Sequence, residues 1–175
     1  TLDLNGKTLT NTNAGKSTLT VTENAVVTAK NGSIVGGTGR YTIEVSSATA
    51  NLTLEGVTAT AGNTGSSMID NWGTMTINSG TYTGGLNVVK SEEGSKLTIN
   101  GGKFTLDYAT NGYTGVILAY GTTTITDGEF IQSVKTCGRW DHPQVVATGV
   151  MEGYPAITKI TGGTFTNNIS GEGIF

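Results

Sequence analysis

The sequence Met-Thr-Ile-Asn-Ser-Gly-Thr-Tyr-Thr fills residues 75–83, and a near copy, Leu-Thr-Ile-Asn-Gly-Gly-Lys-Phe-Thr, fills residues 97–105. Looser copies lie at residues 127–130 and 162–166. Each strict copy joins an apolar-Thr-apolar triplet to a glycine turn, which is followed by one residue of any type and an aromatic residue. Because apolar residues alternate with threonine, the phrase is typical of a strand with one buried face. Its recurrence predicts a repeat protein.

The repeat has a period of about 25 residues over most of the chain. Aligning the copies on the last glycine of each turn gives Gly80, Gly102, Gly128 and Gly163, with weaker copies upstream at Gly6, Gly32 and Gly56. From the N-terminus, the spacings are 26, 24, 24, 22, 26 and 35 residues. A unit of this length with strand-like alternation is one coil of a stacked β-structure, since the two helices of a helical hairpin repeat would show a helical period.

The composition supports an all-β solenoid. The chain has 27 glycines, two prolines and only 13% charged residues, as expected for short strands joined by tight turns. No stretch has the apolar spacing of an amphipathic helix, and no run is long enough to cross a bilayer. We therefore expect one domain over residues 1–175, of about seven coils, without helices and without membrane insertion.

A second apolar segment follows the aromatic residue of each coil after a variable loop. These segments are residues 41–45, 67–69, 86–89, 115–119, 144–147 and 173–175. Each coil thus offers at least two strands, and like residues should stack on like. The expected core columns are Leu54, Ile77, Ile99, Ile125 and Ile160 in one, and Tyr82, Phe104, Phe130 and Phe165 in the other.

Charge and cysteine content exclude several function classes. The net charge is −3, and the ten basic residues are scattered, whereas phosphate binding needs a basic face. Nucleic acid is therefore not an expected partner. Cys137, the single cysteine, rules out an internal disulfide framework. A metal site at Cys137 and His142 would lack ligands, so no metal or other cofactor is expected.

The repeats resemble those of a known superfamily. Residues 2–10 read Leu-Asp-Leu-Asn-Gly-Lys-Thr-Leu-Thr, and with residues 97–105 they resemble the right-handed parallel β-helix repeats of the pectate-lyase-like superfamily. They are similar in particular to repeats of large surface proteins of gut Firmicutes and of fibre or spike proteins of their phages. The resemblance implies a right-handed parallel β-helix, and it leaves function open, because this fold carries lyases, hydrolases, adhesins and phage fibres.

The carboxylates do not match the pattern of a polysaccharide-degrading enzyme. Such an enzyme needs paired carboxylates, or an acidic metal cluster with a base. The five aspartates fall in different coils, and the superfamily's Asp-Asp and Gly-His-Gly motifs are absent. The only acidic doublet, Glu92-Glu93, is interpreted as a solvated turn. We therefore expect no catalysis, with a lyase or hydrolase as an alternative.

Repeated threonines raise an ice-binding surface as a further alternative. Thr-x-Thr pairs occur at Thr58/Thr60, Thr81/Thr83 and Thr164/Thr166, but Lys103 and Glu129 interrupt them in the intervening coils. A cleaner outward column, Thr53, Thr76, Thr98 and Thr124, starts at Asp3 and ends at Lys159. The simplest interpretation is β-propensity on a solvated face.

Two regions carry the residues suited to recognition. Trp72 and Tyr120 each lie five residues before a core isoleucine, with Gly94 at this position in the coil between them, which predicts two aromatic rings about 9.6 Å apart across a gap without a side chain. Aromatic faces of this kind stack on sugar rings. The alternative is that both rings pack over turns.

The second region is an insertion in the long last coil, over residues 131–158. It contains the only histidine, the only cysteine and both prolines, and such concentration of unusual residues marks functional loops. Its candidate ligand-binding residues are Arg139, Trp140, Asp141, His142 and Tyr154. The alternative is a loop that only covers the solenoid.

Together these features predict a non-enzymatic display module of an extracellular, bacterial-surface or virion-surface protein, binding glycan or a host surface. A structural phage fibre or capsid-decoration element is the alternative within the same class. Because an open solenoid exposes strand edges and core at its ends, flanking domains or other subunits are expected to cap at least one end.

Overall fold

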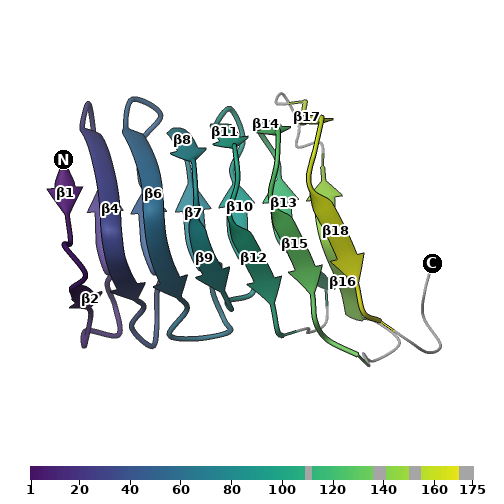
Figure 1. Cartoon of the computed structure of the whole chain (residues 1–175), viewed down its shortest axis with the longest axis horizontal. Helices are drawn as coiled ribbons and strands as arrows, with labels where there is room; N and C mark the ends of the chain where they lie inside the picture. Colours follow the sequence, from purple (N-terminus) through teal and green to yellow (C-terminus); the bar gives the residue numbers. More distant parts are fainter. Residues whose placement is uncertain (109–111, 136–140, 150–154, 170–175) are drawn as a thin grey trace.

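The computed structural model describes residues 1–108, 112–135, 141–149 and 155–169. These residues form an all-β solenoid in which every strand pairing is parallel. The described part of the chain contains no helix, and so none that could span a membrane. Figure 1 shows the coils following one another along the long axis, with β1 near one end and β18 near the other. The predicted fold class is confirmed.

Two sheets form the walls of the solenoid. The first contains twelve strands: β1 (Leu2–Asp3), β2 (Thr8–Thr10), β4 (Val26–Val35), β6 (Asn51–Thr60), β8 (Thr74–Ile77), β9 (Gly80–Thr83), β11 (Lys96–Ile99), β12 (Lys103–Leu106), β14 (Thr122–Ile125), β15 (Glu129–Gln132), β17 (Ile157–Ile160) and β18 (Thr164–Asn167). The second contains six: β3 (Leu19–Val21), β5 (Ile43–Val45), β7 (Ile69–Asn71), β10 (Val89–Ser91), β13 (Gly112–Ala119) and β16 (Asp141–Thr148).

The solenoid makes about five turns, slightly fewer than the seven coils expected. Its first level consists of the short strands β1, β2 and β3. At the other end, the expected second-sheet segment at residues 173–175 lies outside the described residues. The other five second segments overlap β5, β7, β10, β13 and β16, but residues 67–69 and 86–89 share only their last residue with β7 and β10.

A turn with a positive-φ glycine splits the first-sheet strand at the first level and again from the fourth level onward. β4 and β6 run unbroken for ten residues, whereas later levels have a pair of short strands, such as β8 and β9. The second strand of each pair begins at or just after a glycine with positive φ, as at Gly80 (φ 135°) and Gly102 (φ 114°). In the register, Gly80 pairs with Val57 and not with Gly56. The sequence alignment of the Gly56 copy is therefore wrong by one residue.

The aromatic column forms as predicted. Rings stack in the order Tyr82, Phe104, Phe130 and Phe165, with centroids 4.9, 4.9 and 4.8 Å apart, which matches the spacing of neighbouring strands. The Tyr82 hydroxyl donates to the carbonyl of Ser79 at 3.0 Å, so its polar end is satisfied. Only Phe165 departs from the expected burial: it is 37% exposed because it stands at the last described level.

The aliphatic column also forms in register. Leu54, Ile77, Ile99 and Ile125 are fully buried and pair in sequence along β6, β8, β11 and β14. Ile160 follows Ile125 in β17 but is 45% exposed, again at the last described level. Stacking of like residues therefore fills the core throughout, and burial fades only at the end of the column.

The outward threonine column of the first sheet is longer than predicted at its start. Thr53, Thr76, Thr98 and Thr124 align, Thr28 precedes them and Lys159 follows. Asp3 does not start this column, because it pairs with Lys30, two residues further along β4. The first sheet therefore carries an almost unbroken line of small hydroxyls.

Candidate functional site

Charged and aromatic side chains gather on the outward face of the second sheet. The parallel register places Glu44, Asp70 and Lys90 side by side on β5, β7 and β10. Outward residues alternate along a strand, so the next outward position follows two residues later, just beyond each strand end. This position holds Ser46, Trp72, Glu92 and Tyr120, each directly after a residue paired in the register.

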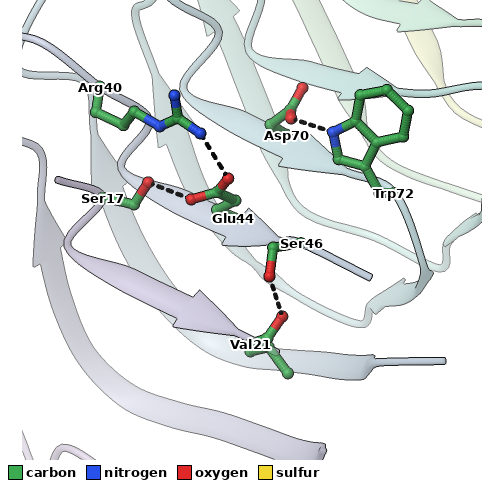
Figure 2. Close-up of polar contacts among 7 residues, drawn as sticks. All are labelled: Ser17, Val21, Arg40, Glu44, Ser46, Asp70 and Trp72. Atoms are coloured by element: carbon green, nitrogen blue, oxygen red, sulfur yellow. Dashed lines mark hydrogen bonds and ion pairs between the residues drawn. The ribbon is translucent and has the colours of Figure 1, made fainter. Parts of the chain in front are cut away.

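Trp72 is bonded to the centre of this cluster. Its indole Nε1 donates to Oδ2 of Asp70 at 2.8 Å, and Figure 2 shows the indole beside that carboxyl group. Asp70 is fully buried, while Trp72 remains 43% exposed. The indole is therefore fixed by Asp70 and still presents a large aromatic surface to solvent.

Lys90 and Glu92 form the second fixed pair. The Lys90 ammonium makes an ion pair with Oε1 of Glu92, whose side chain is almost wholly buried. The same ammonium lies 5.6 Å from the centre of the Tyr120 ring, within the range of a cation–π contact. Burial lowers the pKa of Lys90, but the hydrogen bond and charge of Glu92 outweigh it, so the net shift is upward.

Asp70 and Glu92 form a carboxyl pair. Burial raises the pKa of Asp70, and Glu92 raises it further through its negative charge and a hydrogen bond between the two carboxyl groups, to about 7. The Trp72 bond opposes this shift. Oδ1 of Asp70 is buried and receives no hydrogen bond from a described donor. A proton on Asp70 would give Oδ1 a hydrogen bond, because a protonated carboxyl group can donate to the neighbouring carboxylate of Glu92.

Glu44 anchors the other side of the cluster. Arg40 donates to its Oε1 at 2.9 Å and the Ser17 hydroxyl donates to its Oε2 at 2.7 Å, as drawn in Figure 2. The Arg40 guanidinium lies 4.8 Å from the centre of the Tyr41 ring. Burial and the nearby charge of Asp70 raise the pKa of Tyr41. Both tyrosines of the site therefore have a cation against the ring, and each cation has its own carboxylate.

A groove of about 270 Å³ lies between these tyrosines. Its lining combines aromatic, polar and aliphatic side chains with one cation: Tyr41, Gly65, Ser66, Ser67, Leu86, Asn87, Lys90, Leu118 and Tyr120. The Asn87 amide is fixed from both sides, donating to the Ser67 hydroxyl at 3.2 Å and accepting from the Gly115 N–H at 2.8 Å. The groove is thus largely preformed, with polar groups near its buried side and tyrosines around it.

The predicted aromatic edge exists, but its gap is filled. Trp72 and Tyr120 occupy equivalent positions two levels apart, as expected. Between them the register places Glu92, not Gly94, because the connection from β10 to β11 is two residues longer than those from β7 to β8 and from β13 to β14. The prediction of a gap without a side chain is wrong, and so is the solvated-turn interpretation for Glu92, which is buried.

The structure describes the candidate residues of the inserted segment only in part. Arg139, Trp140 and Tyr154 lie outside the described residues. Asp141 and His142 begin β16, whose backbone pairs with Gly112 and Tyr113 of β13, and their side chains lie outside the description. The range 131–158 therefore includes a strand of the second sheet. The role of these five residues in ligand binding stays a prediction.

The carboxyl pair was missed because its members are 22 residues apart in sequence. Only the pairing of Asp70 with Lys90 makes Glu92 its diagonal neighbour. Glycoside hydrolases use two carboxyl groups that stand about 5 Å or more apart, with a sugar or a water between them. Here both carboxyl groups are shielded from solvent, since Asp70 is fully buried and Glu92 is 3% exposed. Within the described chain, no group of three or more His, Cys, Asp or Glu side chains could hold a metal ion.

Comparison with known proteins adds no further identification: no family model, no curated protein and no solved structure matches the chain.

Proposed function

We propose that this chain is a rigid display module of an extracellular or virion-surface protein and that it binds glycan through the groove of its second sheet. The observation that carries the proposal is the groove itself, where Tyr41 and Tyr120 flank a fixed amide and hydroxyl groups. Binding sites for sugars combine aromatic faces with a few well-placed polar groups. The outward column of the first sheet is mostly threonine, which offers hydrogen bonds and little area.

The scaffold supports presentation of such a site. Residues of the groove come from four successive levels, β5 to β13 with their preceding turns, and the stacked core beneath them is filled by fully buried side chains. A site on a rigid element loses little freedom when the ligand binds. Exposed Trp72 lies on the same face and can extend the contact beyond the groove.

A polysaccharide-degrading enzyme is the second candidate, because an acidic pair with an elevated pKa is a common feature of active sites. Burial of the pair argues against this role, since Asp70 is fully buried and Glu92 is 3% exposed. Incubation of the protein with neutral and acidic polysaccharides, followed by assay of reducing ends and unsaturated products, separates the two functions. Product formation that Asp70→Asn abolishes would favour the enzyme.

The binding proposal is tested by a glycan array followed by calorimetry on the best ligand. Tyr120→Ala and Tyr41→Ala should each weaken binding at least about tenfold, because truncating an aromatic anchor costs more than about 1.4 kcal/mol. Tyr108→Ala is the matched control, since this half-buried tyrosine lies outside the groove lining. Equal affinity of all three variants and the unmodified protein would overturn the assignment of the groove.

A further inference from the structure

The charges around the groove indicate which class of glycan it takes. Lys90 is the only charged residue among the described residues that line it. Its ammonium is not available as an isolated cation, because Glu92 holds it in an ion pair and the pair is largely buried. Arg40, which lies against Tyr41 at the edge of the groove, is likewise bonded to Glu44 at 2.9 Å.

The five ionisable groups of the cluster balance when Asp70 carries a proton. Arg40 and Lys90 supply two positive charges, and Glu44 and Glu92 supply two negative ones. Asp70 is then neutral, accepts a hydrogen bond from the Trp72 indole and has a proton that it can donate to Glu92. Loss of the proton leaves the cluster with a net negative charge. In neither state does the cluster offer unpaired positive charge to an anionic ligand.

The neutral groups of the groove have capacity for hydroxyl groups. The Ser67 hydroxyl accepts from Asn87 and can still donate, since a hydroxyl has one donor and two acceptor sites. Lys90 retains donors beyond the one used by Glu92. Each tyrosine has a cation near the centre of its ring, and Gly149 also lies close to the Tyr120 ring. The parts of the two rings that line the groove supply its aromatic surface.

From this arrangement we propose that the groove selects uncharged glycans and that Glu92, by neutralising Lys90, is the residue that excludes acidic ones. The inference rests on the proposed glycan-binding function of the same groove. Glu92 acts as a specificity-determining residue through Lys90, in the way that a paired charge in a binding site penalises the wrong partner. A sugar carboxylate would have to displace a buried carboxylate from its ion pair, whereas a neutral sugar would not.

The test removes the negative charge that neutralises Lys90 and leaves the Lys90 side chain unchanged. In Glu92→Gln alone, Asp70 would lose its acidic neighbour, ionise and neutralise Lys90 in place of Glu92. The informative variant is therefore Asp70→Asn/Glu92→Gln. Asn at position 70 still accepts from the Trp72 indole. The matched control is Asp70→Asn, in which Glu92 continues to neutralise Lys90. Circular dichroism and thermal melting establish that each variant keeps its fold.

Binding is measured at pH 7 against paired neutral and uronate-containing oligosaccharides of equal length. The unmodified protein and Asp70→Asn should prefer the neutral member, and the double variant should gain at least about tenfold in affinity for the uronate member. Adding Lys90→Met to the double variant should remove that gain. Preference of the unmodified protein for the uronate member, or no gain in the double variant, would overturn the selectivity and leave glycan binding standing. Absence of binding to every oligosaccharide would overturn the proposed function itself.

Discussion

The two sheets of this solenoid share one core and differ in what they present outward. The first sheet repeats the same residues level after level: besides its threonine column it carries an amide ladder, in which Asn78 donates to Glu55 at 3.3 Å and Asn100 donates to Asn78 at 2.9 Å. On the second sheet, equivalent outward positions hold Glu44, Asp70 and Lys90, followed by Leu118. Repetition stabilises the scaffold, and departure from repetition concentrates the polar and aromatic groups that can recognise a ligand.

The difference predicts that the shared core dominates stability. Phe104→Ala removes the central ring of a column stacked at 4.9 Å on both sides, and should lower the free energy of unfolding by about 3–5 kcal/mol. Thr105→Ala, on the outward side of the same strand, should change it by less than about 1 kcal/mol. Urea denaturation measures both. Similar losses in the two variants would contradict the division between core and outward face.

The second sheet should give the protein its pH dependence. The pKa of Asp70 is raised to about 7 from 3.8, so the folded state holds a proton that the unfolded chain has lost. Its stabilising contribution is complete below about 3.8 and disappears as the pH rises through about 7. Asp70→Asn should therefore gain stability relative to the unmodified protein between pH 5 and pH 8, by at most about 4 kcal/mol.

Thermal melting at pH 5 and pH 8 measures this gain. Glu55→Gln, a change of one carboxylate on the first sheet, serves as the control and should shift the melting temperature by a similar amount at both pH values. If Asp70→Asn also changed the melting temperature by the same amount at pH 5 and pH 8, the carboxyl pair would not share a proton.

A smaller effect should follow from loss of the indole bond to Asp70. Trp72→Phe keeps an aromatic ring and removes the 2.8 Å hydrogen bond, which should cost about 1–2 kcal/mol. Because that bond opposes the rise in the pKa of Asp70, the variant should also titrate this group at higher pH. Carbon-detected NMR of the Asp70 carboxyl group measures the shift. A downward shift or no shift would contradict the assigned contact.

The smallest effect is expected at the exposed ion pair of the first sheet. Lys103 and Glu129 pair at 3.0 Å, with both side chains nearly half exposed, and such a pair contributes less than about 1 kcal/mol. Lys103→Thr/Glu129→Thr should therefore leave the unfolding free energy almost unchanged while restoring threonine at both positions between Thr81 and Thr164. Thermal hysteresis in this double variant, with none in the unmodified protein, would show that the two charges block an ice-binding face.

Periodicity made the regular parts of the molecule predictable. Alternation of apolar residues with threonine assigned strands and inward positions, and the aromatic column followed because identical residues recur at identical places in each coil. The alignment was wrong at Gly56, because this positive-φ glycine lies one residue before Val57, the residue that pairs with Gly80. It also failed at Asp3, where the short first strand pairs two residues further along.

The sequence by itself determined the fold class, the core columns and the outward threonines, because each depends on a period that local residue order contains. The sequence also predicted Trp72 and Tyr120 as candidate binding residues, whereas tertiary structure alone decided the groove and the carboxyl pair. Asp70, Glu92 and Tyr120 come together through the register of three strands, and a connection longer by two residues moved Glu92 into the place where counting put Gly94. Loop length changes which residues become neighbours without altering the repeat pattern. Burial then raised the pKa of Asp70, an effect that depends on surroundings the linear chain does not specify.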